Sequence, residues 1–95
     1  MRDPKLTDAA VQAALALRVG WSLQGGMIVR TFVFTNFVAA MRFVNAVADA
    51  AEAADHHPDM DIRYNKVTLA LTTHDSGGLT EKDFALAAQA DTLSA

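Results

Sequence analysis

Cysteine is absent from this 95-residue chain, which excludes disulfides, zinc-thiolate sites and thiol nucleophiles. Basic charge is sparse as well. Eight Lys and Arg residues are scattered among eleven Asp and Glu, so the net charge of −3 offers no basic field to a phosphate backbone, and direct nucleic-acid binding is not expected. No apolar run approaches the ~18 residues that span a bilayer, and no signal-peptide core opens the chain. We therefore expect a soluble, cytoplasmic protein that does not contact a membrane.

Apolar residues, in contrast, are plentiful for so short a chain. They make up 52% of it, and many are alanines between residues 39 and 54. The length suits a single domain over residues 1–95, whose own core can bury only part of this apolar surface. We therefore expect a homo-oligomer, a dimer or a tetramer, in which alanine-rich helices approach one another closely.

Three segments have the pattern of capped helices. Thr7 can cap the first, which should run to about Arg18. The second begins at Thr35 or Asn36 and lasts some eighteen residues, and Thr80 can cap the third, which runs toward Asp91. The apolar stripe expected on the second helix consists of Phe37, Ala40, Met41, Val44, Val47, Ala48 and Ala51.

Two hairpins alternate with these helices. The first joins residues 21–24 to 27–34 through Gly25-Gly26, a pair that tolerates the positive φ of a tight turn. Both faces of its second strand are largely apolar, so that strand should lie inside the sheet. The second hairpin joins residues 62–64 to 66–74 around Asn65. The predicted fold class is α+β, with a four-stranded antiparallel sheet and three helices packed on one face in two layers.

The three histidines of the chain are His56, His57 and His74, and the second hairpin decides whether they can meet. With a turn at Tyr64-Asn65, His57 falls opposite Thr72 and His56 opposite Thr73, and His74 lies one residue beyond. With the turn moved by one residue, His57 faces His74 directly. Either register brings the histidines within the roughly 5 to 8 Å of cross-strand neighbours, provided that pairing continues past Pro58.

A set of motifs around the histidines resembles the signature of the pterin-4a-carbinolamine dehydratase family, in order and in spacing. The motifs are Glu52-Ala53-Ala54-Asp55-His56-His57-Pro58, Tyr64-Asn65-Lys66-Val67, Thr72-Thr73-His74-Asp75, and Gly78-Leu79-Thr80 with Asp83. The resemblance extends back through Arg30, Phe32, Phe34 and Phe37 to Trp21 and so covers most of the chain. It implies an α+β fold and a tetrameric assembly.

The resemblance also implies a pterin site in which His56, His57 and His74 are catalytic and in which Glu52, Pro58, Thr73 and Asp83 contact or surround the substrate. It implies no cofactor and no metal. The reaction is the loss of water from a 4a-hydroxytetrahydropterin to give a quinonoid dihydropterin, which recycles a tetrahydrobiopterin-type cofactor.

Histidine suits this chemistry because an acid must protonate the departing hydroxyl while a base removes a ring proton. Imidazole, with an ordinary pKa near ~6.5, can do either at neutral pH. We assign proton transfer to His56 and His74 and substrate holding mainly to His57. Glu52 lies four residues before His56 and would orient a histidine if the helix persists that far.

Two positions depart from the family pattern. Met60 stands where relatives often carry a tryptophan, which removes an aromatic wall for the flat pterin while leaving a polarisable contact. Lys82 stands where arginine is frequent, and lysine makes a weaker planar or bidentate contact.

Other interpretations of the same residues remain open. His56-His57 could be a polar loop before a strand, and Asp83 could serve only as the third-position partner of the Thr80 cap. Three imidazoles could hold zinc, although adjacent strand residues point to opposite faces. The chain could also act without catalysis, as a dimerisation cofactor or assembly factor for another protein, since relatives of the family are known in such roles.

Overall fold

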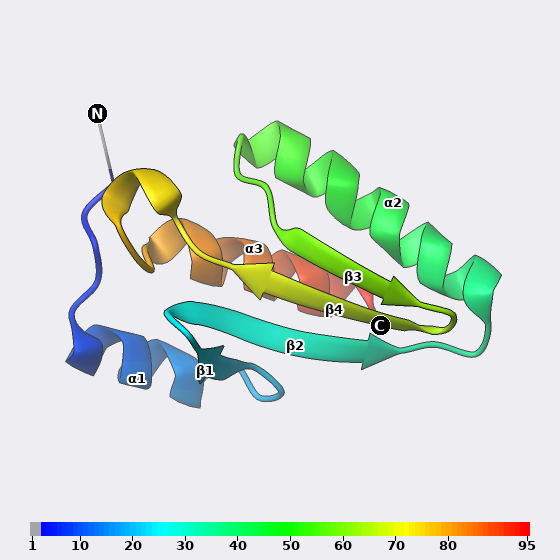
Figure 1. The fold of residues 1–95 in the computed structure, drawn as a ribbon, viewed down its shortest axis with the longest axis horizontal. Coiled ribbons are helices and arrows are strands. Elements are labelled where there is room, and N and C mark those ends of the chain that lie inside the picture. The colour runs from blue at the N-terminus through cyan, green and yellow to red at the C-terminus, as the bar shows by residue number, and fades with distance from the viewer. Residues whose placement is uncertain (1–2) are drawn as a thin grey trace.

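A computed structural model describes residues 3–95 and contains the predicted four-stranded antiparallel sheet with three helices (Figure 1). The strand order is β1-β2-β4-β3, so β2 is an interior strand as expected. The elements follow one another as α1 (Asp8–Ala16), β1 (Ser22–Gln24), β2 (Met27–Val33), α2 (Phe37–Ala54), β3 (Asp59–Arg63), β4 (Lys66–Leu71), the 3-10 turn η1 (His74–Ser76) and α3 (Glu81–Leu93). None of these helices is long and apolar enough to cross a membrane.

Both hairpins are closed by the predicted two-residue turns. Gln24 pairs with Met27 across Gly25-Gly26. Arg63 pairs with Lys66 across Tyr64-Asn65, which is the first of the two registers considered from the sequence. The ladder between β3 and β4 ends at the pair Asp59 and Ala70, so Pro58 and the two histidines before it lie outside the sheet.

Polar side chains begin all three helices, as their sequence positions predict. Thr7 Oγ1 accepts the backbone N–H of Ala10 at 3.1 Å, and Asn36 Oδ1 accepts that of Ala39 at 2.8 Å. At α3 a capping box forms, in which Thr80 caps the helix and Asp83 accepts the Thr80 backbone N–H. Each cap satisfies amide groups that have no partner inside the helix.

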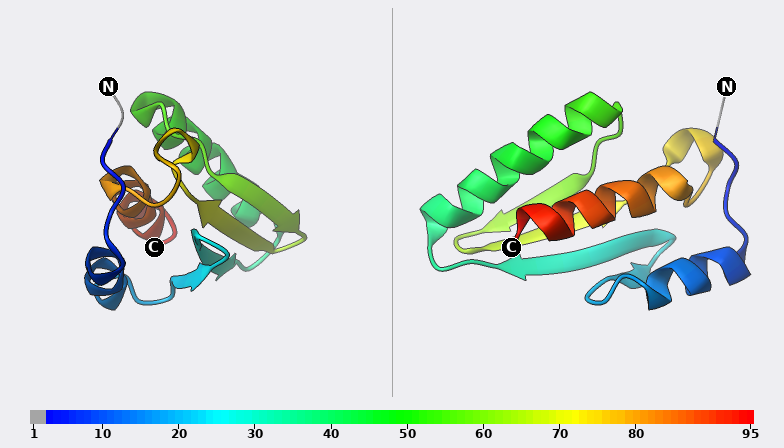
Figure 2. Two further views of the ribbon diagram at one scale, coloured as in Figure 1. Left: turned by 60° about the vertical axis from the view of Figure 1, so that its left-hand side comes forward. Right: turned by 180° about the vertical axis from the view of Figure 1, so that it is seen from behind.

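The helices form one layer against the sheet, and the two remaining views show them on the same side of the strands (Figure 2). The core between the layers is apolar, with Ile28 and Leu71 from the sheet and Val47 and Ala90 from the helices all fully buried. Helix α1 adds Val11 to the same cluster. This two-layer packing is the architecture that the order of hairpins and helices in the sequence predicts.

The buried face of α2 differs in detail from the predicted stripe. Ala40, Val44, Val47 and Ala51 are buried as expected, but Phe37 is 48% exposed and Ala48 is also exposed. The buried face is rotated toward Phe43, which the stripe did not include. The ring of Phe43 packs against Phe32 and Phe34 at centroid distances of 4.7 and 5.0 Å, so one aromatic residue of β2 and one directly after it determine which side of the helix turns inward.

A polar cluster, which we name the Asp91 cluster, ties the ends of α1 and α3 to the sheet. Asp91 Oδ1 accepts the indole N–H of Trp21 at 2.9 Å and the Nη1 of Arg30 at 2.6 Å, while its Oδ2 accepts Arg18 Nη1 at 3.1 Å. The guanidinium of Arg30 also stacks over the ring of Phe32 at 4.3 Å. Trp21 and Arg30 therefore both help to hold α3 against the sheet.

Candidate active site

The end of α2 separates the two adjacent histidines. Asp55 ends the helix in the left-handed region at φ 51° and ψ 43°, and the backbone N–H of His56 returns to the carbonyl of Ala51 at 3.0 Å. The chain turns so sharply here that His56 points inward and is 8% exposed, whereas His57 is exposed. Aspartate tolerates this backbone conformation better than most residues.

His56 belongs to a buried hydrogen-bond network centred on Asp83. His56 Nε2 lies 2.6 Å from Asp83 Oδ1, and Asp83 itself has no exposed surface in the chain. Its other oxygen, Oδ2, accepts the hydroxyl of Thr73 and the backbone N–H of Thr80, both at 2.9 Å. The hydroxyls of Thr73 and Thr80 lie 2.8 Å apart.

This network fixes the orientation of the His56 ring. An ionised carboxylate only accepts hydrogen bonds, so with Asp83 ionised His56 Nε2 is the donor. The second ring nitrogen, Nδ1, is then left to accept or release a proton elsewhere. A buried carboxylate that accepts three donors in this way is an orienting group, because its own oxygens are occupied.

Glu52 contacts a different histidine from the one its spacing suggested. The helix does not persist to His56, since Asp55 leaves it, and Glu52 Oε2 instead hydrogen-bonds Nε2 of His57 five residues later. Both side chains are largely open to solvent, at 78% and 56% exposed. Each histidine of the pair therefore has its own carboxylate, one at the surface and one inside.

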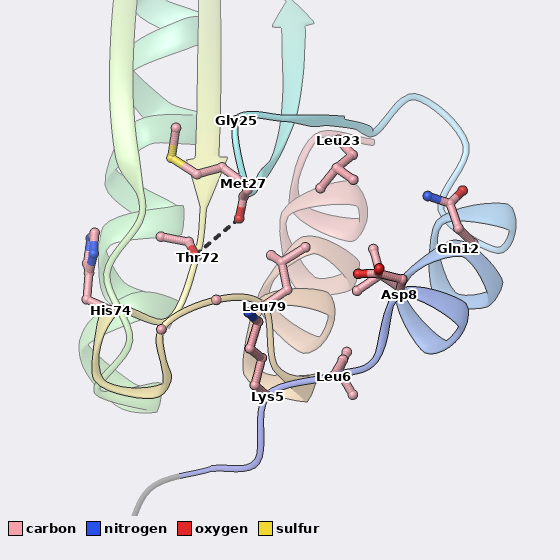
Figure 3. A pocket seen from close by; sticks show the side chains of 14 residues that line it. Lys5, Leu6, Asp8, Gln12, Leu23, Gly25, Met27, Thr72, His74 and Leu79 are labelled. Carbon is pink, nitrogen blue, oxygen red and sulfur yellow. Dashed lines mark hydrogen bonds between the residues drawn. The ribbon is translucent and has the colours of Figure 1, made fainter.

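His74 begins η1 and is exposed at the end of the sheet, directly after Thr73. Within residues 3–95 its side chain makes no hydrogen bond or ion pair. It lines one side of a cavity of about 780 Å³, together with Thr72 and residues from three other segments (Figure 3). His56 and His57 do not line this cavity. His74 is linked to His56 through the neighbouring residue Thr73, whose hydroxyl bonds the same carboxylate, Asp83, as His56 does.

The remaining candidate residues occupy less central positions. Pro58 is half-buried between His57 and the start of β3. Met60 packs against the hydrophobic core, and Lys82 forms an ion pair with Asp3 at 3.1 Å, which occupies it at the surface. In the described part of the chain, no three His, Asp or Glu side chains are arranged to hold a metal ion.

Two parts of this site were not found from the sequence. The Thr80 hydroxyl was expected only to cap α3, yet it also bonds Thr73. The cavity beside His74 is walled in part by residues 5–12, where the sequence predicted a helix cap but no site residue. Neither part has a local signal, because each arises from segments that meet only in the folded chain.

The fold and the site together define a small α+β domain with an oriented, carboxylate-paired histidine and a second histidine at a cavity, an arrangement suited to proton transfer on a small molecule. A family model described as "Pterin 4 alpha carbinolamine dehydratase" matches residues 4–93. The chain therefore belongs to the pterin-4a-carbinolamine dehydratase family, as its motifs suggested.

Similar proteins agree with this assignment. A protein of Chloroflexus aurantiacus, provisionally named a pterin-4-alpha-carbinolamine dehydratase, is 62% identical over 95% of this chain and 97% of its own length. A protein of Acidobacterium capsulatum with the same provisional name is 56% identical over 94% of this chain and 97% of its own.

Two solved structures share the fold. The crystal structure of a transcriptional coactivator/pterin dehydratase from Brucella melitensis has a TM-score of 0.92 and 34% identity, covering 96% of this chain and 99% of the other. A pterin dehydratase-like protein, identified as a RuBisCO assembly factor in the alpha-carboxysome, has a TM-score of 0.68 and 27% identity over 79% of this chain and 89% of its own.

Proposed function

We propose that this protein is a hydro-lyase that removes water from a 4a-hydroxytetrahydropterin to yield a quinonoid dihydropterin. The observation that carries the proposal is the buried network in which Asp83 holds His56 and, through Thr73, the segment that bears His74. His56, oriented by this carboxylate, and His74, which directly follows Thr73, would supply the acid and the base that a dehydration needs. Membership of the family supports the same reaction.

The reaction balances without any other reactant. One imidazolium protonates the hydroxyl on the ring carbon, the bond between that carbon and oxygen breaks, and the lone pair of the adjacent nitrogen forms the new double bond. A neutral imidazole then takes a proton from the ring. One histidine has therefore lost a proton and the other has gained one, so the pair carries the same number of protons before and after the reaction. We assign these steps to His56 and His74.

Glu52, His57 and Pro58 would bind the pterin at the exposed side of the site. His57 is open to solvent and is oriented by Glu52, so it can donate to or accept from a ring heteroatom. Asp83 and Thr73 are both buried, and their part in the proposal is to position His56 and the His74 segment.

The test is direct. The carbinolamine is generated enzymatically, and its decay is followed spectroscopically with and without the protein. His74→Ala should slow the catalysed reaction by about 10²- to 10⁴-fold, the usual contribution of a positioned acid or base. Asn45→Ala, at an exposed position on α2, is the matched control. Full activity in His74→Ala would refute the assignment.

We also propose that the protein recycles a tetrahydrobiopterin-type cofactor in the cytoplasm and that it works as a homotetramer. The alanine-rich surface of α2 and the shallow apolar depression between α2 and α3, lined by Ala50, Ala88 and Leu93, support association between copies. Light scattering on the purified protein should give a mass about four times that of one chain, and a monomer would contradict the proposal.

A second candidate function is that of a non-catalytic assembly factor. The observation that favours it is the likeness to the pterin dehydratase-like assembly factor of the alpha-carboxysome. Stoichiometric co-purification with another protein, unaffected by His74→Ala, would support this function. Intact dehydration activity that depends on the histidines, with no co-purifying protein, would contradict it.

A further inference from the structure

Thr80 makes more hydrogen bonds than a helix cap requires. As the cap of α3, its hydroxyl oxygen accepts the backbone N–H of Lys82 at the long distance of 3.3 Å. The same oxygen lies only 2.8 Å from the hydroxyl of Thr73, and Thr80 has no exposed surface in the chain. We propose that Thr80 is a positioning residue of the dehydratase site, which acts through Thr73 on the placement of His56 and His74. The inference rests on the function proposed above.

The direction of each hydrogen bond around Thr80 follows from the protons available. Asp83, as an ionised carboxylate, only accepts, so the single hydroxyl proton of Thr73 is donated to Asp83 Oδ2 at 2.9 Å. The oxygen of Thr73 can then only accept, and Thr80 is the donor of the bond between the two hydroxyls. Capping uses a lone pair of the Thr80 oxygen, whereas this bond uses its proton. The cap and the bond to Thr73 therefore use different parts of one hydroxyl group.

Three of these hydrogen bonds form a closed triangle. Thr80 donates its hydroxyl to Thr73, Thr73 donates to Asp83 Oδ2, and the backbone N–H of Thr80 donates to the same Oδ2 at 2.9 Å. Each bond limits the rotation of the side chains that form the other two. Thr73 is 7% exposed and the other two residues are 0% exposed, so solvent cannot readily replace a donor that is removed.

The triangle holds both proposed catalytic histidines. On one side, the second oxygen of Asp83 lies 2.6 Å from His56 Nε2. On the other side, Thr73 begins the loop that carries His74, and its backbone N–H and carbonyl bond those of Gly78 at 3.2 and 3.3 Å. A shift of Thr73 would therefore move His74 at the edge of its cavity (Figure 3). Catalysis is sensitive to such a displacement, because a misplacement of about 1 Å can cost about a hundredfold in rate.

The experiment replaces the hydroxyl of Thr80 by a methyl group of similar size. Thr80→Val should lower kcat for the carbinolamine by about tenfold or more while KM changes by less than about twofold, since displaced histidines impair the chemical step rather than substrate binding. Thr80→Ser keeps both the lone pair and the proton and should retain most of the wild-type kcat. Thr80→Gly also removes the hydroxyl, at a cap position that glycine tolerates, and supplies the same test if Thr80→Val does not fold.

Asn36→Ala is the matched control, because it removes the cap of α2 at the far end of that helix from His56. Circular dichroism verifies that each variant is folded. The control should leave kcat unchanged, so a fall in kcat equal to that of Thr80→Val would overturn the inference by showing that any lost cap has this effect. A wild-type kcat in folded Thr80→Val or Thr80→Gly would overturn it as well.

A second measurement separates this inference from the function on which it rests. In isotopically labelled protein, the Nε2–H proton of His56 should give a nuclear magnetic resonance signal, because the buried bond to Asp83 slows its exchange with water. Thr80→Val should broaden or remove this signal, whereas Thr80→Ser and Asn36→Ala should retain it. If wild type proves inactive, this signal decides. Its loss in Thr80→Val alone would support the positioning role while the proposed reaction fails, and an unchanged signal would overturn both.

Discussion

His56 Nε2 lies 2.6 Å from Asp83 Oδ1, and this contact joins the end of α2 to the first turn of α3 across 27 residues of sequence. The same carboxylate closes the capping box of α3 by accepting the backbone N–H of Thr80. Asp83 therefore begins a helix and orients a histidine at once. A change at this one position should affect both the stability of the fold and the proposed chemistry.

Asp83→Asn should lower the free energy of unfolding by about 1 to 3 kcal/mol, because a buried acceptor of three donors loses its charge and one of its accepting atoms. Urea denaturation measures this change. We also expect kcat for dehydration to fall more than KM rises, since His56 loses its orientation. Asp59→Asn, an exposed carboxylate on β3, is the control, and equal stability of the two variants would contradict the prediction.

Glu52→Gln should affect substrate binding but not stability, in contrast to Asp83→Asn. The pair of Glu52 and His57 is largely exposed, and exposed pairs contribute little, so the free energy of unfolding should change by less than about 0.5 kcal/mol. The KM for the carbinolamine should rise because His57 is no longer held by a carboxylate. Steady-state kinetics beside urea denaturation checks both parts, and a large loss of stability would show that the pair has a structural role instead.

Asp91→Ala should destabilise the protein by about 1 to 3 kcal/mol, because three donors lose their shared acceptor in a partly buried position. Trp21 is the only tryptophan of the chain, so its fluorescence reports this site directly. The emission maximum should shift in the variant. Asp61→Ala breaks an exposed ion pair with Arg63 and should cost well under 1 kcal/mol with no shift in emission.

Gly78→Ala should be tolerated by the fold. The new Cβ would meet the flexible end of Lys5, which can move aside, so the loss in the free energy of unfolding should stay below about 1 kcal/mol. Urea denaturation measures the change. A loss well above this value would show that the Lys5 side chain is held firmly in its present position.

The parts of the fold that the sequence predicted depend on neighbouring residues. Gly25-Gly26 and Tyr64-Asn65 close their hairpins, and the three helix caps form, because each device acts within about four residues. From its spacing, Glu52 was expected to contact His56 rather than His57. This expectation failed because Asp55, in the left-handed region, ends the helix before His56. No periodic pattern in the sequence predicts the φ value of a single residue such as Asp55.

The parts that escaped prediction depend on contacts distant in sequence. Asp91 meets Arg30 across 61 residues and Trp21 across 70, and no spacing rule connects them. The inward orientation of Phe43 likewise follows from its contacts with Phe32 on β2 and with Phe34 directly after that strand. The family motifs identified the histidines and Asp83 without revealing that Asp83 is buried.

The attachment of α1 has a kinetic consequence. Arg18 reaches Asp91, and Ser76 reaches the backbone of Asp3, each across 73 residues, so the segments on both sides of the first helix are held by contacts very distant in sequence. Closing such long loops is entropically costly, and we expect these contacts to form after the sheet has assembled. They should also open first in the native state, so that amide protons of α1 exchange with solvent faster than those of β4. Transient release of α1 would then provide a route by which a small molecule enters and leaves beside His74 while the strands stay intact.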